Sequence, residues 1–142
     1  VFAARMPLAE HLARHRQADL FLDTLPYNAH TTTSDALWAG LPVLTCLGET
    51  FAGRVAASLL RAAGLPELVT TSLEAYEALA LRLAREPHAL AALRVRLQAQ
   101  RDSCPLFDTG RFCDHLESAY QTMYQNHQSG HMPRSFSVEA RA

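Results

Sequence analysis

Short apolar runs alternate with amphipathic stretches over the first half of the chain, and this alternation restricts the fold more than any other feature. The runs at residues 18–24, 42–46 and 67–71 have the length and composition of buried parallel strands. Residues 1–5, "VFAAR", resemble part of another strand, so we expect the natural protein to continue upstream. Strands that alternate with helices over short connections predict a parallel sheet with right-handed crossovers, which is the α/β class.

Helix signals fill the intervals between these runs and give the order β-α-β-α-β-α-β. A first helix is predicted at about residues 7–16, where leucines four positions apart form one apolar side. A second, at about 32–39, ends at Gly40, and a third, at about 51–63, ends at Gly64. The sheet should therefore be covered by helices.

From Ser72 onward the pattern is helical. Helices are predicted over residues 72–86, with Ser72 as a cap candidate, and over 87–101, which begins at a proline. A last helix is predicted from about 109 to 127, with an apolar stripe along one side. The stripe consists of Phe112, Leu116, Ala119, Tyr120 and Met123. Residues 128–142 have no periodicity and are predicted to form a disordered tail.

The charged residues disfavour several kinds of chemistry. All 13 basic residues are arginine, so this chain supplies no phosphate-binding, Schiff-base or general-base lysine. A net charge of -1 lacks the basic field that binding to nucleic acid or to an anionic membrane usually requires. No D-x-D pair is present to hold a metal-bound nucleoside diphosphate, so we expect any phosphate chemistry to be independent of metal.

Length and cysteine content indicate one cytoplasmic domain. The 142 residues are 49% hydrophobic, which is enough for a proper core. The apolar runs are too short to cross a bilayer, and no basic leader precedes an apolar region. Three cysteines without C-x-x-C spacing favour reduced thiols over a disulfide framework or a zinc site.

The segment "NAHTTTSDALWAGLPVL", residues 28–44, carries an unusual number of hydrogen-bonding groups between two predicted strands. Ligands of an open parallel sheet bind beyond the carboxyl ends of the strands, where loops lead into helix amino termini. Free N–H groups there attract anions, and Thr31 and Thr32 would add hydroxyl donors beside His30. The segment therefore suits a phosphate, with Asp35 available to accept hydrogen bonds from two ribose hydroxyls.

Helix capping is the competing interpretation of the same residues. Threonine is an ordinary N-cap, and Thr32 followed three residues later by Asp35 is close to a capping box. An exposed helix terminus stabilises an anion by only about 0.3 to 1 kcal/mol, which is too little to hold a diphosphate alone. On spacing alone, capping is favoured, and a diphosphate site would need a cation from another segment.

Further polar residues follow the neighbouring strands. His11 and Arg14 lie three apart on one helix face, where imidazole could stack on a nucleotide base and guanidinium could hydrogen-bond to it. A solvated helix surface also explains them and, on the sequence pattern alone, is the favoured interpretation. Glu49, Thr50 and Arg54 could line the same cleft, or could be an N-cap and an ordinary ion pair.

The stretch "HTTTSDALWAGLPVLTCLGETFAGRVAASLL" closely resembles the O-linked N-acetylglucosamine transferases, glycosyltransferase family 41. The resemblance runs from "MPLAEHLARHRQADLFLDTLPYNAH" to "CPLFDTGRFCDHLESAYQTMY", about residues 6–124, and bacterial members look closest. It implies a Rossmann-like parallel sheet with flanking helices, the carboxyl-terminal half of a GT-B glycosyltransferase. Residues 1–127 would be its UDP-sugar-binding lobe, followed by the tail at 128–142.

The resemblance also implies roles for residues of this chain. Thr31 and Thr32 match the threonines that hold the donor diphosphate, with His30 beside them, and Asp35 matches the aspartate that binds the ribose. His11 and Arg14 match residues that recognise uracil. The backbone of Met6 matches the position that hydrogen-bonds the base.

Several elements of the family pattern are missing from this chain. Leu8 stands where eukaryotic members have a lysine near the ribose and base, which implies one fewer donor contact. The other lobe with its proposed catalytic histidine, an upstream lysine that meets the diphosphate, and upstream tetratricopeptide repeats that engage protein acceptors would all lie outside it. The chain therefore implies partners in the amino-terminal lobe and repeats of the same protein, with no catalytic residue and no metal of its own.

The implied reaction is transfer of N-acetylglucosamine from UDP-GlcNAc to a Ser or Thr hydroxyl of a protein or peptide, with inversion and without metal. The donor-binding residues would stabilise the leaving diphosphate, and the isolated chain is expected to be inactive. Two alternatives stay open. One is a UDP-sugar epimerase lobe of the same architecture, and the other is a non-catalytic interaction domain in which the threonines only cap a helix.

Overall fold

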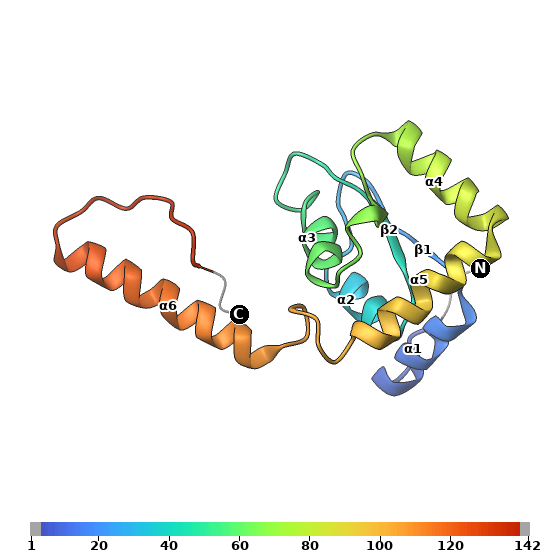
Figure 1. The fold of residues 1–142 in the computed structure, drawn as a ribbon, viewed down its shortest axis with the longest axis horizontal. Helices are drawn as coiled ribbons and strands as arrows, with labels where there is room; N and C mark the ends of the chain where they lie inside the picture. The colour runs from blue at the N-terminus through green and yellow to red at the C-terminus, as the bar shows by residue number, and fades with distance from the viewer. Residues whose placement is uncertain (1–3, 140–142) are drawn as a thin grey trace. The chain divides into compact units, whose positions relative to one another are not determined.

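The protein is described here by a computed structural model that covers residues 4–139, shown in Figure 1. The chain divides into two compact units, residues 1–104 and residues 105–142. The first unit contains the sheet and most of the helices, and the second contains the last helix. The prediction of one lobe over residues 1–127 stays a prediction.

Three short parallel strands form the sheet, in the order β1-β2-β3. They are β1 (Phe21–Leu22), β2 (Val43–Cys46) and β3 (Val69–Thr70). All four residues of β2 are buried, as expected for a central strand of a parallel sheet covered on both faces. The three predicted internal strands are confirmed, although each is shorter than its apolar run. The strand predicted at residues 1–5 falls mostly outside the described residues, and its described end has no regular structure.

Helices connect the strands in the predicted order. They are α1 (Leu8–Arg14), α2 (Thr31–Trp38), α3 (Val55–Ala62), α4 (Leu73–Arg85) and α5 (Pro87–Gln100), with short 3-10 turns at His15–Gln17 and Pro66–Leu68. Helix α2 follows β1 and α3 follows β2, and the two helices pack against each other and against β2. Helix α4 packs against β2 and β3, and α5 packs against α4.

Helix α3 begins later than predicted because a tight turn occupies residues 48–53. The Gly48 N–H donates to the Gly53 carbonyl at 2.7 Å, and the Thr50 hydroxyl accepts from the Gly53 N–H at 3.1 Å. Thr50 therefore closes the turn and does not cap the helix. The Arg54 guanidinium donates to the backbone carbonyl of Glu49, and within residues 4–139 these two side chains form no ion pair.

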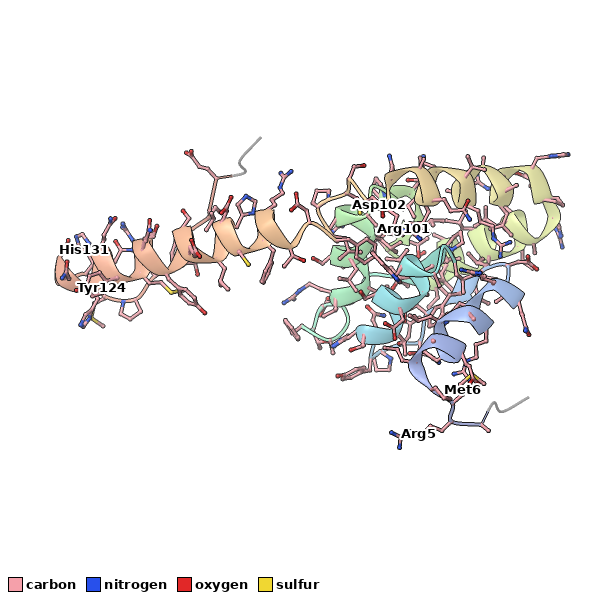
Figure 2. All side chains as sticks on the ribbon, turned by 90° about the horizontal axis from the view of Figure 1, so that it is seen from below. Arg5, Met6, Arg101, Asp102, Tyr124 and His131 are labelled. Atoms are coloured by element: carbon pink, nitrogen blue, oxygen red, sulfur yellow. The ribbon has the colours of Figure 1, made fainter. Side chains whose placement is uncertain are left out.

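The predicted helix ends and the serine cap are confirmed. Gly40 and Gly64 adopt positive φ angles of 83° and 74°, which non-glycine residues rarely reach. The Ser72 hydroxyl accepts from the Ala75 N–H at 3.2 Å and so caps α4. After α5, the Arg101 guanidinium lies 5.0 Å from the centre of the Trp38 ring and pairs with Asp102 at 3.1 Å (Figure 2). These contacts tie the end of α5 to the end of α2.

The second unit contains α6 (Thr109–Gln128), in agreement with the predicted last helix. The Asp108 carboxylate caps it by accepting from the Arg111 N–H at 2.9 Å. Residues 131–139 carry no helix or strand, and disorder of the predicted tail stays a prediction. Among the described residues, no helix is long and apolar enough to cross a membrane.

Candidate functional site

The amino terminus of α2 lies at the carboxyl end of β1 and is not capped by any side chain. His30 occupies the N-cap position, so Thr31 and Thr32 are the first two residues of the helix. Both threonine side chains are exposed, and neither hydroxyl has a hydrogen-bond partner within the described chain. The first N–H groups of a helix have no intrahelical acceptor. This terminus therefore offers backbone and hydroxyl donors to solvent.

The capping interpretation of Thr32 and Asp35 is wrong. The helix begins one residue before Thr32, so Thr32 lies inside the first turn and cannot act as the N-cap. Thr33 has a structural role instead, because it is fully buried and its hydroxyl donates to the Ala29 carbonyl at 2.9 Å. Two of the three consecutive threonines thus remain available to a ligand.

Asp35 lies one turn into α2 and meets His11 of α1. The His11 Nε2 is 3.7 Å from the Asp35 Oδ2, and the two side chains are 23% and 27% exposed. The His11 ring also contacts His15 edge-on, with 4.8 Å between ring centres. Two residues predicted from separate segments to bind the nucleotide are therefore neighbours, and both remain accessible to solvent.

Met6 and Arg14 flank His11 along the chain. The Arg14 guanidinium donates to the Ala4 carbonyl at 3.3 Å, which folds it back toward the segment before α1. Figure 2 shows Met6 at the amino-terminal end of α1, and its side chain is half-buried. Within residues 4–139, neither residue forms a hydrogen bond or ion pair with α2. The structure thus brings His11 to the α2 site, whereas Met6, just before α1, and Arg14, the last residue of α1, form no such contact with α2 in the described part of the chain.

An aromatic cluster surrounds His30. Tyr27 stacks on its ring at 5.0 Å with 19° between the planes, and Phe51 contacts it edge-on at 6.1 Å. The His30 Nε2 lies 3.4 Å from the Ala52 carbonyl. Tyr27 and Phe51 are mostly exposed, and they come from the loops after β1 and β2. Sequence reasoning missed these contacts because two aromatic residues in separate loops carry no periodic signal.

Asp23 is a second residue that sequence reasoning missed. Its side chain is only 5% exposed, and it directly follows β1. Oδ1 accepts from the Thr24 N–H at 2.9 Å and the Ala29 N–H at 2.7 Å, and Oδ2 accepts from the Thr45 hydroxyl at 2.6 Å. The signal in the sequence is a carboxylate directly after the apolar residues 20–22. A carboxylate at the end of a buried strand can itself be buried only if its hydrogen bonds are satisfied.

Tyr76 of α4 completes the surroundings of Asp23. Its hydroxyl donates to the Asp23 carbonyl at 2.9 Å. Burial raises the pKa of the Tyr76 phenol above its ordinary value, and the nearby charge of Asp23 raises it further. Both effects disfavour the phenolate, so the hydroxyl stays a donor and links α4 to the end of β1.

Other candidate features lie away from the α2 terminus. A groove of about 670 Å³ is lined mainly by apolar residues of α4, α5 and the segment around β1, including Leu22, Leu83 and Leu90. Within residues 4–139, no group of three His, Cys, Asp or Glu side chains is arranged to hold a metal ion.

Comparison with known proteins identifies the family. The sequence profile of Glycosyl transferase family 41 matches residues 1–116. This chain belongs to glycosyl transferase family 41. The resemblance inferred from the HTTTSD segment and its surroundings is thereby confirmed.

Curated relatives match most of this chain. A probable UDP-N-acetylglucosamine–peptide N-acetylglucosaminyltransferase, SEC, of Arabidopsis thaliana is 46% identical over 131 residues, 92% of this chain and 13% of the relative. The UDP-N-acetylglucosamine–peptide N-acetylglucosaminyltransferase of Caenorhabditis elegans is 38% identical over 130 residues, 92% of this chain and 11% of the relative. The chain thus spans about an eighth of the length of these curated relatives.

A solved structure confirms the fold. A lysine-to-methionine variant of the O-GlcNAc transferase of Thermobaculum terrenum superimposes with a TM-score of 0.81 at 45% sequence identity. The match covers 85% of this chain and 23% of the other chain. The predicted class, a Rossmann-like parallel sheet with flanking helices as in GT-B glycosyltransferases, is therefore correct for this member of family 41.

Proposed function

We propose that this chain is the UDP-sugar-binding carboxyl-terminal lobe of a GT-B protein O-GlcNAc transferase. The observation that carries the proposal is the uncapped amino terminus of α2, where Thr31 and Thr32 are exposed one turn before Asp35. Family membership and the names of the relatives support the same activity. Because the chain spans only part of those relatives, the activity belongs to the full-length protein.

The contacts suggest how UDP would lie. The diphosphate would accept hydrogen bonds from the first N–H groups of α2 and from the Thr31 and Thr32 hydroxyls, with His30 beside them. The Asp35 carboxylate, 3.7 Å from His11, would accept from the ribose hydroxyls. The uracil would then extend toward α1, where His11, Arg14 and the Met6 backbone are available.

The same donors would serve the chemistry. Transfer to a Ser or Thr hydroxyl breaks the bond between the anomeric carbon and the diphosphate, and negative charge develops on the leaving oxygens. Donors already fixed at a helix terminus stabilise this charge without having to reorganise. We propose inversion at the anomeric carbon and no requirement for a metal, with the acceptor base supplied from outside residues 1–142.

The remaining parts of the proposal concern partners and place. An amino-terminal catalytic lobe and tetratricopeptide repeats of the same protein would contribute the base, a cation for the diphosphate and the acceptor-binding surface. We propose that the protein itself is cytoplasmic and that its acceptor is a protein or peptide. Residues 1–142 alone are expected to show no turnover, because the proposed base lies elsewhere.

A product assay tests the function. The full-length protein is incubated with UDP-GlcNAc and Ser/Thr-containing peptides in the presence of EDTA, and the peptides and free sugar nucleotides are then analysed by mass spectrometry and chromatography. A glycosylated peptide with released UDP is the expected result. An altered free UDP-sugar would indicate an epimerase, and intact UDP-GlcNAc with no UDP bound would indicate a non-catalytic domain. Activity restored only by a divalent metal would contradict metal independence.

A further inference from the structure

We propose that Asp23 is the positioning residue that sets the direction of the N–H groups at the start of α2. This proposal rests on the proposed function, because it concerns the same diphosphate site. Asp23 itself is nearly fully buried and touches no ligand position, so it would act only through the residues that it holds.

The carboxylate closes the loop that leads into α2. One oxygen, Oδ1, accepts from the N–H groups at both ends of the loop, Thr24 at 2.9 Å and Ala29 at 2.7 Å. Ala29 is the residue immediately before the N-cap, His30. Any movement of the Ala29 N–H therefore changes the position at which the helix begins.

The other carboxylate oxygen fixes this arrangement to the sheet. Oδ2 accepts from the hydroxyl of Thr45, a fully buried residue of the central strand β2, at 2.6 Å. The Asp23 N–H donates to the Leu44 carbonyl at 3.0 Å, so the backbone of Asp23 is also part of the ladder between β1 and β2. The carboxylate is thus a rigid link between the sheet and the loop.

A second set of hydrogen bonds connects the loop to α2. The Ala29 carbonyl accepts from the buried Thr33 hydroxyl at 2.9 Å, which ties the held loop residue to the first turn of α2. The neighbouring Asn28 is fully buried and its N–H donates to the Ala52 carbonyl at 3.2 Å. Since binding donors must be held close to their productive geometry by supporting contacts, loss of Asp23 should misdirect the helix terminus.

The test compares UDP with uridine in the full-length protein. Uridine lacks the diphosphate, so the ratio of the two dissociation constants measures the diphosphate contribution and is insensitive to a general loss of folded protein. We expect Asp23→Ala to weaken UDP binding by about 10- to 100-fold, the scale of a small misplacement of binding groups, with little change for uridine. Calorimetry gives the UDP constant, and displacement of labelled UDP gives the uridine constant.

Two further variants separate positioning from stability. Asp23→Asn keeps an oxygen that can accept from the Ala29 N–H, so it should recover most of the UDP affinity. Thr45→Val removes the hydrogen bond between β2 and the Asp23 Oδ2 but keeps the hydrogen bonds from the loop to Oδ1. It should therefore lower the melting temperature, and it should change the ratio of the UDP and uridine dissociation constants much less than Asp23→Ala does. Asp23→Ser, whose hydroxyl is too short to reach Ala29, replaces the alanine variant if that variant does not fold.

Each outcome is decisive. Wild-type protein that does not bind UDP overturns the proposed function itself. If the wild type binds UDP, two results would overturn only the positioning role of Asp23. Either Asp23→Ala binds UDP as tightly as the wild type does, or it loses the same factor of affinity for UDP and for uridine. Failure of both Asp23→Ala and Asp23→Ser to fold would make Asp23 a residue of the stabilising core and would also overturn its positioning role.

Discussion

The Nε2 of His11 lies 3.7 Å from the Oδ2 of Asp35, and this pair connects the face of α1 to the first turns of α2. The two residues are 24 positions apart in the chain, on helices that precede and follow β1. Their proximity places a base-recognition candidate beside a ribose-recognition candidate. A nucleoside bound there would contact both helices at once.

A double-mutant cycle on this pair should show coupling. His11→Ala and Asp35→Asn should each weaken UDP binding, and the double variant should lose less than the sum of the two, by about 0.5 to 1 kcal/mol, because contacting residues share one interaction. Calorimetry on the four full-length proteins gives the coupling. His11→Ala combined with Ser72→Ala, which removes the cap of α4, is the control and should be additive. Additivity for His11 with Asp35 would show that the pair does not act together on the nucleotide.

Restoring a lysine at residue 8 should tighten UDP binding. Leu8 is 67% exposed, so a longer polar side chain can be accommodated there without loss of core packing. The resemblance to eukaryotic members implies a lysine near the ribose and base at this position. We expect Leu8→Lys to lower the UDP dissociation constant about fivefold, equivalent to about 1 kcal/mol. Leu8→Gln is the uncharged control and should bind like the wild type, and equal affinity of all three proteins would place residue 8 away from the nucleotide.

Tyr76 should make stability depend on pH above its ordinary pKa of 10.0. The pKa of the phenol is raised in the folded protein, so the folded state binds this proton more tightly than the unfolded state does. Its contribution to the free energy of unfolding is therefore fully present below pH 10.0 and is lost as pH rises through the raised pKa. Melting temperatures are measured between about pH 8 and 11, a range that spans the ordinary tyrosine pKa of about 10. They should fall more steeply with pH for the wild type than for Tyr76→Phe. Parallel curves would contradict a raised pKa of the Tyr76 phenol in the folded protein.

Two glycine substitutions should have opposite effects on stability. Gly64 ends α3 at a φ of 74°, and an added Cβ would lie 2.8 Å from the Gln100 side-chain oxygen. Because Gln100 can move, the remaining penalty is the left-handed backbone, so Gly64→Ala should cost about 1 to 2 kcal/mol. Gly110→Ala, in the first turn of α6, meets no closer atom than the Asp108 carboxylate at 3.5 Å and should stabilise by up to about 1 kcal/mol. Melting curves of the two variants should move in opposite directions, and a shared direction would contradict this assignment of backbone strain.

Local patterns predicted the order of elements because each carries a short-range physical signal. The apolar run around β2, the stop at Gly40 and the cap at Ser72 are all visible in a few neighbouring residues, and all three are confirmed. Element ends were less predictable. The start of α3 moved to Val55 because the turn at 48–53 depends on a hydrogen bond between two glycines, which periodicity does not report.

The same difference between short-range signals and long-range contacts explains why the candidate site was predicted only in part. The resemblance and the position after a strand pointed to Thr31, Thr32 and Asp35, yet spacing favoured a Thr32 cap, and the structure places the N-cap two residues earlier, at His30. The residues that hold the loop were missed because their contacts are long-range. Asp23 reaches Thr45 across 22 residues, and such pairings become visible only once the sheet is assembled.

The central claim is that the start of α2 holds the diphosphate of UDP. The most direct test is calorimetric titration of UDP, without added metal, into the full-length wild type and into the Thr31→Val/Thr32→Val double variant. Valine keeps the shape of threonine at two exposed positions, so both proteins should melt alike. Loss of two hydrogen bonds to a charged ligand, each worth about 1.5 to 3 kcal/mol, should weaken binding by at least about 100-fold. Equal UDP affinity in two equally folded proteins would contradict the claim and would leave the threonines without a role in nucleotide binding.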